Sequence, residues 1–114
     1  MGYRLHVARK FRVEYALGDA FNYKVEEFHD LLSACGAEYT GEIFDADFEV
    51  SKEDWTMMIE KLKNLGSNND AREKADIQRF IDYLESTADE VIRMLEYFLK
   101  NSDPENDFLH LSFF

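Results

Sequence analysis

The pattern of hydrophobic and polar positions divides the chain into segments of two periods. Between residues 3 and 15 every second residue is apolar except Arg9, which predicts one strand with a β-bulge near Arg9-Lys10. A tight hairpin at that point is disfavoured, because Arg-Lys supplies none of the positive-φ residues that two-residue turns need. Residues 44–50 and 108–114 alternate in the same way. We therefore expect strands at all three places.

Two segments, residues 21–35 and 51–65, carry apolar residues at the spacing of one helical face. Gly36 and Gly66 follow them directly and are expected to end the two helices. The sequence therefore predicts one helix before and one helix after the second strand.

The start of the second helix has a specific signature. Ser51 followed by Asp54 resembles a capping box with Asp in place of the usual Glu, and Val50 and Trp55 hold the two positions of a hydrophobic staple. We expect Trp55 to be buried, since it combines the staple position with the apolar stripe of the helix.

A third helical segment covers residues 70–100. Thr87 and Glu90 could cap a new helix inside it. The heptad seam keeps its phase through that point, which favours one long helix of about 45 Å. The seam consists of Ile77, Ile81, Leu84, Ala88, Val91, Leu95 and Phe98.

The resulting order β-α-β-α-α-β predicts an α+β fold within a single domain, residues 1–114. We expect a small three- or four-stranded sheet with three helices packed mainly on one face. The C-terminal strand is expected to pair with the first or the second strand, because exposed alternate Leu and Phe would promote aggregation.

The composition indicates a soluble protein without disulfides. Hydrophobic residues make up 46% of the chain, enough for a core without metals. Cys35 is the only cysteine, and no apolar run approaches the roughly 20 residues that span a bilayer. We expect a cytoplasmic location and no membrane contact.

Charge is distributed unevenly along the chain. The net charge is −11; residues 1–13 carry four basic and no acidic side chains, whereas residues 38–54 carry seven acidic side chains and one lysine. Such a field disfavours direct binding of nucleic acid and favours basic partners. We expect the basic first strand to lie beside the acidic second strand, where opposite charges would pair.

Several short patterns resemble chemical sites but are incomplete. Asp45-x-Asp47-x-Glu49 resembles the opening of a calcium loop, yet the positions of its required Gly and Glu are occupied by Val50 and Thr56. The acidic row is therefore interpreted as a solvated strand face.

Two further residues could carry chemistry. Glu26-x-x-His29 occurs only once, so His29 is interpreted as a surface histidine, and Cys35 lies on an apolar helical stripe where a buried thiol is expected. No phosphate-binding glycine loop or zinc spacing is found. We expect no catalytic residue, no cofactor and no metal, and hence not an enzyme.

The function that follows is a binding one. We expect a small acidic intracellular protein-binding domain, an inhibitor or immunity-type regulator of a basic partner that handles nucleic acid. The alternatives are a homo-oligomeric structural subunit and a domain that binds a small ligand or a metal. The residues expected to face the partner are Asp45, Asp47, Glu49, Glu53 and Asp54.

Overall fold

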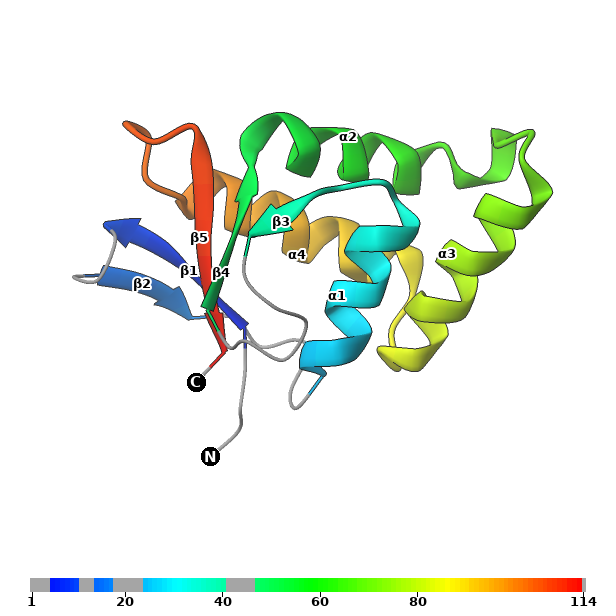
Figure 1. The fold of residues 1–114 in the computed structure, drawn as a ribbon, viewed down its shortest axis with the longest axis horizontal. Helices are drawn as coiled ribbons and strands as arrows, with labels where there is room; N and C mark the ends of the chain where they lie inside the picture. Colours follow the sequence, from blue (N-terminus) through cyan, green and yellow to red (C-terminus); the bar gives the residue numbers. More distant parts are fainter. Residues whose placement is uncertain (1–4, 11–13, 18–23, 41–46, 114) are drawn as a thin grey trace.

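Helices and strands form a mixed α+β structure in which the helices pack on an antiparallel sheet (Figure 1). The computed structural model describes residues 5–10, 14–17, 24–40 and 47–113. The strands in these ranges are β1 (Leu5–Lys10), β2 (Glu14–Leu17), β3 (Tyr39–Thr40), β4 (Asp47–Ser51) and β5 (Phe108–Phe113). The helices are α1 (Val25–Ala34), α2 (Lys52–Lys63), α3 (Ala71–Tyr83) and α4 (Ala88–Asn101), with a short 3-10 turn η1 (Leu65–Ser67).

The sheet has five strands among the described residues, in the order β2-β1-β5-β4-β3, and each of its pairings is antiparallel. The expected count of three or four strands is too low, because the first predicted strand is two strands and the short strand β3 was not predicted. The C-terminal strand β5 lies at the centre, between β1 and β4 (Figure 1). The expectation that this strand pairs with the first or the second predicted strand is confirmed, because it pairs with both. The central position buries the three apolar residues of β5 that face the helices, which are Leu109, Leu111 and Phe113.

The first predicted strand is in fact a hairpin, so the prediction of one strand over residues 3–15 is wrong. β1 and β2 pair antiparallel, with Lys10 opposite Glu14. Both strands have period two, and therefore the alternation alone does not reveal a reversal of direction between them. The register shifts between Ala8 and Lys10, which agrees with the bulge predicted there. The connection at residues 11–13 lies outside the described residues.

The basic strand β1 does not lie beside the acidic strand β4, so the expectation that these two strands are neighbours is wrong. β5 lies between β1 and β4, so the two are not hydrogen-bonded to each other. Glu49 of β4 faces His110 across the ladder, and Asp47 faces Ser112. The sequence could not supply this order, because the strand that separates them comes last in the chain.

The end predicted for the first helix is confirmed, whereas the second helix does not end at Gly66, because α2 stops at Lys63 and Gly66 lies within the turn η1. Gly36 has φ +79°, a left-handed conformation that suits glycine, directly after the end of α1. At the start of α2 the side chain of Ser51 accepts a hydrogen bond of 3.1 Å from the backbone N–H of Asp54. Val50 and Trp55, the two staple residues, are fully buried.

The long third helix is two helices, so that prediction is wrong. α3 ends at Tyr83, Glu85 has φ +56°, and α4 begins at Ala88. The Thr87 hydroxyl accepts a hydrogen bond of 3.2 Å from the N–H of Glu90, as the rejected capping pattern requires.

The two halves of the heptad seam serve different neighbours. α3 packs mainly on α1, whereas α4 packs on α2 and β1. A straight helix of about 45 Å could not follow both surfaces, so the chain turns between them. The seam residues nevertheless remain the buried side of each helix: Ile77 and Ile81 in α3, and Val91, Leu95 and Phe98 in α4.

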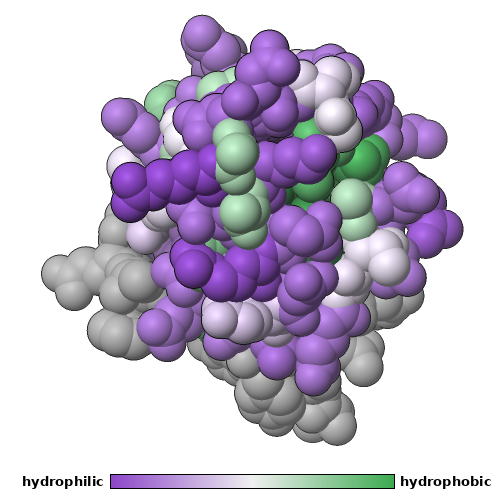
Figure 2. Space-filling model, turned by 90° about the vertical axis from the view of Figure 1, so that its right-hand side faces the viewer, coloured by the Kyte–Doolittle hydropathy of each residue, from purple (hydrophilic) through white to green (hydrophobic). Residues whose placement is uncertain are grey.

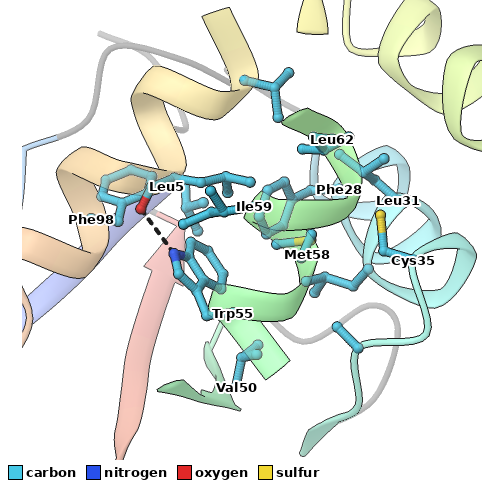
Figure 3. Close-up of a cluster of buried hydrophobic side chains, with 14 of the residues drawn as sticks. Leu5, Phe28, Leu31, Cys35, Val50, Trp55, Met58, Ile59, Leu62 and Phe98 are labelled. Carbon is cyan, nitrogen blue, oxygen red and sulfur yellow. Dashed lines mark hydrogen bonds between the residues drawn. The ribbon is translucent and has the colours of Figure 1, made fainter. Parts of the chain in front are cut away.

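The core lies between the helices and one face of the sheet. Phe28 of α1 is fully buried, with its ring centroid 6.1 Å from those of Phe48 and Trp55 and 6.5 Å from that of Phe113. Trp55 is also fully buried, and its indole N–H donates a hydrogen bond of 2.9 Å to the Leu95 carbonyl oxygen (Figure 3). The helices α1, α2 and α4 therefore cover one face of the sheet, as predicted. The described residues form four helices and not three, and the fourth, α3, packs mainly on α1.

Candidate partner-binding cavity

The face of the sheet opposite the helices carries polar side chains and is here named the outer face. It comprises His6, Thr40, Asp47, Glu49, Ser51, Phe108, His110 and Ser112, as the strand registers require. Its exposure is uneven. His6 and Ser112 are buried, whereas Thr40, Asp47 and Phe108 are exposed. The accessible part therefore includes β3, the start of β4 and the start of β5.

Two of the predicted partner-binding residues lie on this face in β4. Asp47 is exposed and accepts a hydrogen bond from the Ser112 hydroxyl on β5. Glu49 is half-buried, and its Oε1 atom lies 3.5 Å from Nδ1 of His110. The two carboxylates therefore point to the same side, with neighbours on the central strand.

Asn106 holds the start of β5 in place beside them. Its Oδ1 atom accepts a hydrogen bond of 3.0 Å from the Phe108 N–H, and its Nδ2 atom lies 2.9 Å from Nε2 of His110. The same amide therefore contacts both the backbone of Phe108 and the ring of His110.

Asp54 joins the outer face to the start of α2. Besides its role in the cap, its Oδ2 atom accepts a hydrogen bond of 3.0 Å from the backbone N–H of Glu38, just before β3. This bond ties the edge strand to the helix. It brings the side chain of Glu38, which is exposed, to the same end of the sheet.

A cavity of about 240 Å³ opens where these elements meet. Its lining includes residues at the junction where β4 runs directly into α2, and Figure 1 shows the course of the chain at that junction. Carboxylates, hydroxyls and aromatic rings line the cavity together. The lining residues are Glu38, Tyr39, Thr40, Glu49, Ser51, Asp54 and Phe108. We refer to it as the acidic cavity.

The five residues predicted to face a partner lie in different places in the structure. Glu49 and Asp54 line the acidic cavity, while Asp47 lies on the outer face and outside the lining. Glu53 is exposed in the first turn of α2, also outside the lining. Asp45 lies outside the described residues.

Sequence reasoning missed five of the lining residues: Glu38, Tyr39, Thr40, Ser51 and Phe108. One signal was present for Phe108. It has the opposite parity to Leu109 and Leu111 in an alternating strand, so an apolar ring on the outer face was foreseeable. Phe108 is indeed 42% exposed. The other four missed residues could not be assigned to the lining without knowledge of the strand order.

The remaining chemical candidates are part of the core. His29 is fully buried between the rings of Tyr39 and Phe48, with Nδ1 2.7 Å from the Val25 carbonyl oxygen, so its interpretation as a surface histidine is wrong. In α1 the imidazole faces the sheet, where Tyr39 of β3 and Phe48 of β4 cover it.

Cys35 is buried as predicted. Burial raises the pKa of its thiol to about 12, and the nearby Lys61 opposes this shift only in part. The thiolate that a nucleophile needs is therefore scarce at neutral pH.

Across the described ranges, no three His, Cys, Asp or Glu side chains form a group that could hold a metal ion. No helix within these ranges is long and apolar enough to cross a bilayer. The end of the molecule formed by α3 is mainly hydrophilic, with hydrophobic side chains showing in small areas only (Figure 2).

These observations define the molecule as an α+β fold with an acidic, partly aromatic cavity at the end of its sheet. Comparison of the chain with protein families, with curated proteins and with solved structures finds no match. The function is therefore argued from the cavity and its surroundings.

Proposed function

We propose that this chain is a small acidic protein-binding domain that binds a basic partner through the outer face and the start of α2. The observation that carries the proposal is the position of the acidic row. The central strand β5 separates Asp47 and Glu49 from the basic strand β1, so the two segments of opposite charge are not paired along one ladder.

The charge of the whole chain supports the same proposal. A net charge of −11 repels phosphate backbones and attracts basic surfaces. A partner that handles nucleic acid has such a surface, and an acidic protein bound there would compete with the nucleic acid. We therefore propose a cytoplasmic inhibitor or immunity-type regulator of such a partner.

The test compares two variants with equal changes in charge. Asp47→Asn with Glu49→Gln neutralises the outer face, and Asp82→Asn with Glu85→Gln neutralises two exposed residues near the end of α3. Asn at position 47 keeps a hydrogen-bond acceptor for Ser112. Wild type and both variants are used to capture proteins from a host lysate, and association with the captured partner is then measured at low and high salt.

We expect the outer-face variant to associate about fivefold more slowly at low salt, with a weaker dependence on salt, because it has lost the steering field at the interface. The control variant should associate like the wild type. Equal rates for all three proteins, or equal losses in both variants, would contradict the proposal, since charge at the outer face would then have no special part.

A further inference from the structure

The acidic cavity combines aromatic rings with carboxylates in its lining. Phe108 is 42% exposed at the start of β5, whose other side chains are half-buried or buried. The exposed ring supplies the cavity with an apolar aromatic surface that a partner side chain can contact. Tyr39 adds a second ring to the lining. This ring makes an edge-to-face contact with His29, and the two ring centroids lie 4.6 Å apart.

The polar part of the lining selects for positive charge. Glu38, Glu49 and Asp54 contribute three carboxylates, and no Lys or Arg is among the described lining residues. The nearest lysine in sequence, Lys52, donates its Nζ to the Asp103 carbonyl oxygen at 2.7 Å. The electrostatic attraction of the cavity is thus directed to a cation from outside.

We infer that the acidic cavity receives the guanidinium group of an arginine side chain of the partner. The inference rests on the proposed function and names the group that the basic partner inserts. A guanidinium is planar, stacks on aromatic rings and donates paired hydrogen bonds to carboxylates, so it uses both kinds of lining residue at once.

Two other cations fit the cavity less well. A metal ion needs several oxygens gathered around one point, and the described carboxylates form no such group. A lysine ammonium is a compact and strongly hydrated charge, which gains less from the flat faces of Phe108 and Tyr39.

The experiment uses blocked amino acids as probes of the free protein. N-acetyl-arginine amide is titrated into isotope-labelled protein, and amide chemical shifts are followed by NMR. N-acetyl-citrulline amide, a neutral analogue of the same shape, and N-acetyl-lysine amide serve as comparisons. We expect saturable shifts at the amides of Thr40, Ser51 and Phe108 with the arginine probe, none with citrulline, and about threefold weaker binding of lysine.

Two variants assign the contributions of charge and ring. Glu38→Gln with Glu49→Gln should weaken arginine binding about tenfold. Phe108→Leu keeps an apolar residue without the aromatic face and should weaken it about threefold. The control pair Asp82→Asn with Glu85→Gln changes the charge equally outside the cavity and should leave binding within about twofold of wild type.

Three outcomes would overturn the inference: no shifts in the cavity with arginine, equal binding of lysine, or equal binding by the carboxylate variant and the control. The comparison of probes on the wild type holds even if a variant fails to fold. If partner capture depends on Asp47 and Glu49 while the arginine probe does not bind, the inference fails and the proposed function stands. If capture is insensitive to the outer face, the proposed function fails independently.

Discussion

Trp55 is the side chain whose removal should cost the fold most. It is fully buried at the junction of α2, α4 and the sheet, its ring lies 6.1 Å from that of Phe28, and its indole N–H is bonded to the Leu95 carbonyl at 2.9 Å. Trp55→Ala removes the ring contacts, opens a cavity and deletes the hydrogen bond in one step. The change therefore tests the whole packing arrangement of α2.

The expected magnitude can be set against the total stability. A buried Trp→Ala change costs about 3 to 5 kcal/mol, whereas a chain of this length has about 6 to 17 kcal/mol of unfolding free energy. The variant should still fold but melt about 12 to 20 °C lower, since about 1 kcal/mol lowers the melting temperature of such a domain by about 4 °C. Trp55→Phe keeps most of the ring and loses the bond to Leu95, so we expect a smaller cost of about 1 to 3 kcal/mol.

The assay must not depend on the residue that is removed. Because Trp55 is the only tryptophan, unfolding is followed by far-ultraviolet circular dichroism in urea and on heating. Tyr83→Ala is the matched control, since this ring is 53% exposed and its loss should change stability by less than about 1 kcal/mol. A Trp55→Ala protein that melts within a few degrees of the control would refute the packing described for α2.

Three further predictions test other parts of the fold. Thr87→Ala should lower the free energy of unfolding, measured in urea, by about 1 kcal/mol, because the hydrogen bond from the Glu90 N–H to the Thr87 hydroxyl is lost. If residues 70–100 formed one continuous helix, the same change would stabilise the protein, since Ala is the better helix former. Gly36→Ala should lower the free energy of unfolding, followed by thermal melting, by about 1 kcal/mol, because φ is +79° at this residue. The added Cβ would not clash, since the nearest atom, Lys61 Nζ, lies 3.7 Å away. A stabilised variant would contradict that backbone conformation. Cys35 should react with thiol reagents only on unfolding. Since its pKa rises from 9.0 to about 12 in the folded state, the unfolded state binds fewer protons in that window, and stability should fall more steeply between pH 9 and about 12 than in Cys35→Ala; equal slopes would contradict its burial.

Local signals in the sequence predicted the parts of the fold that local interactions determine. Ser51 and Asp54 form the expected cap, Gly36 ends α1, and the alternating residues of β5 are buried on the expected side. Each of these features depends on residues within one turn or one strand.

The predictions failed where contacts between segments distant in the sequence determine the structure. The apolar seam shows that a helix face is buried but not against which element, so its regular phase concealed the break at Thr87. The capping pattern at that residue was the correct signal, and it was outweighed. Likewise the alternation of the first segment continued through a reversal of direction, because two paired strands have the same period.

The acidic cavity could be predicted only in part. Glu49 and Asp54 were found from the density of acidic residues in one segment, whereas Phe108 comes more than fifty positions later in the chain. Its contribution depends on β5 pairing with β4, with Phe108 opposite Ser51. A pairing at that sequence separation leaves no trace in local periodicity.

The central place of β5 also determines when the molecule can assemble. β1 and β4 acquire their shared neighbour only when β5 has been made, so the parts of the sheet on either side of it stay apart until then. The turn before this strand is exposed at Pro104 and Glu105. A chain divided there would give one fragment that lacks β5 and a second that carries it. The first fragment would have an unoccupied strand position between β1 and β4, and the second would fill that position by strand addition. The protein is therefore suited to a split reporter in which the two fragments fold when they bind each other.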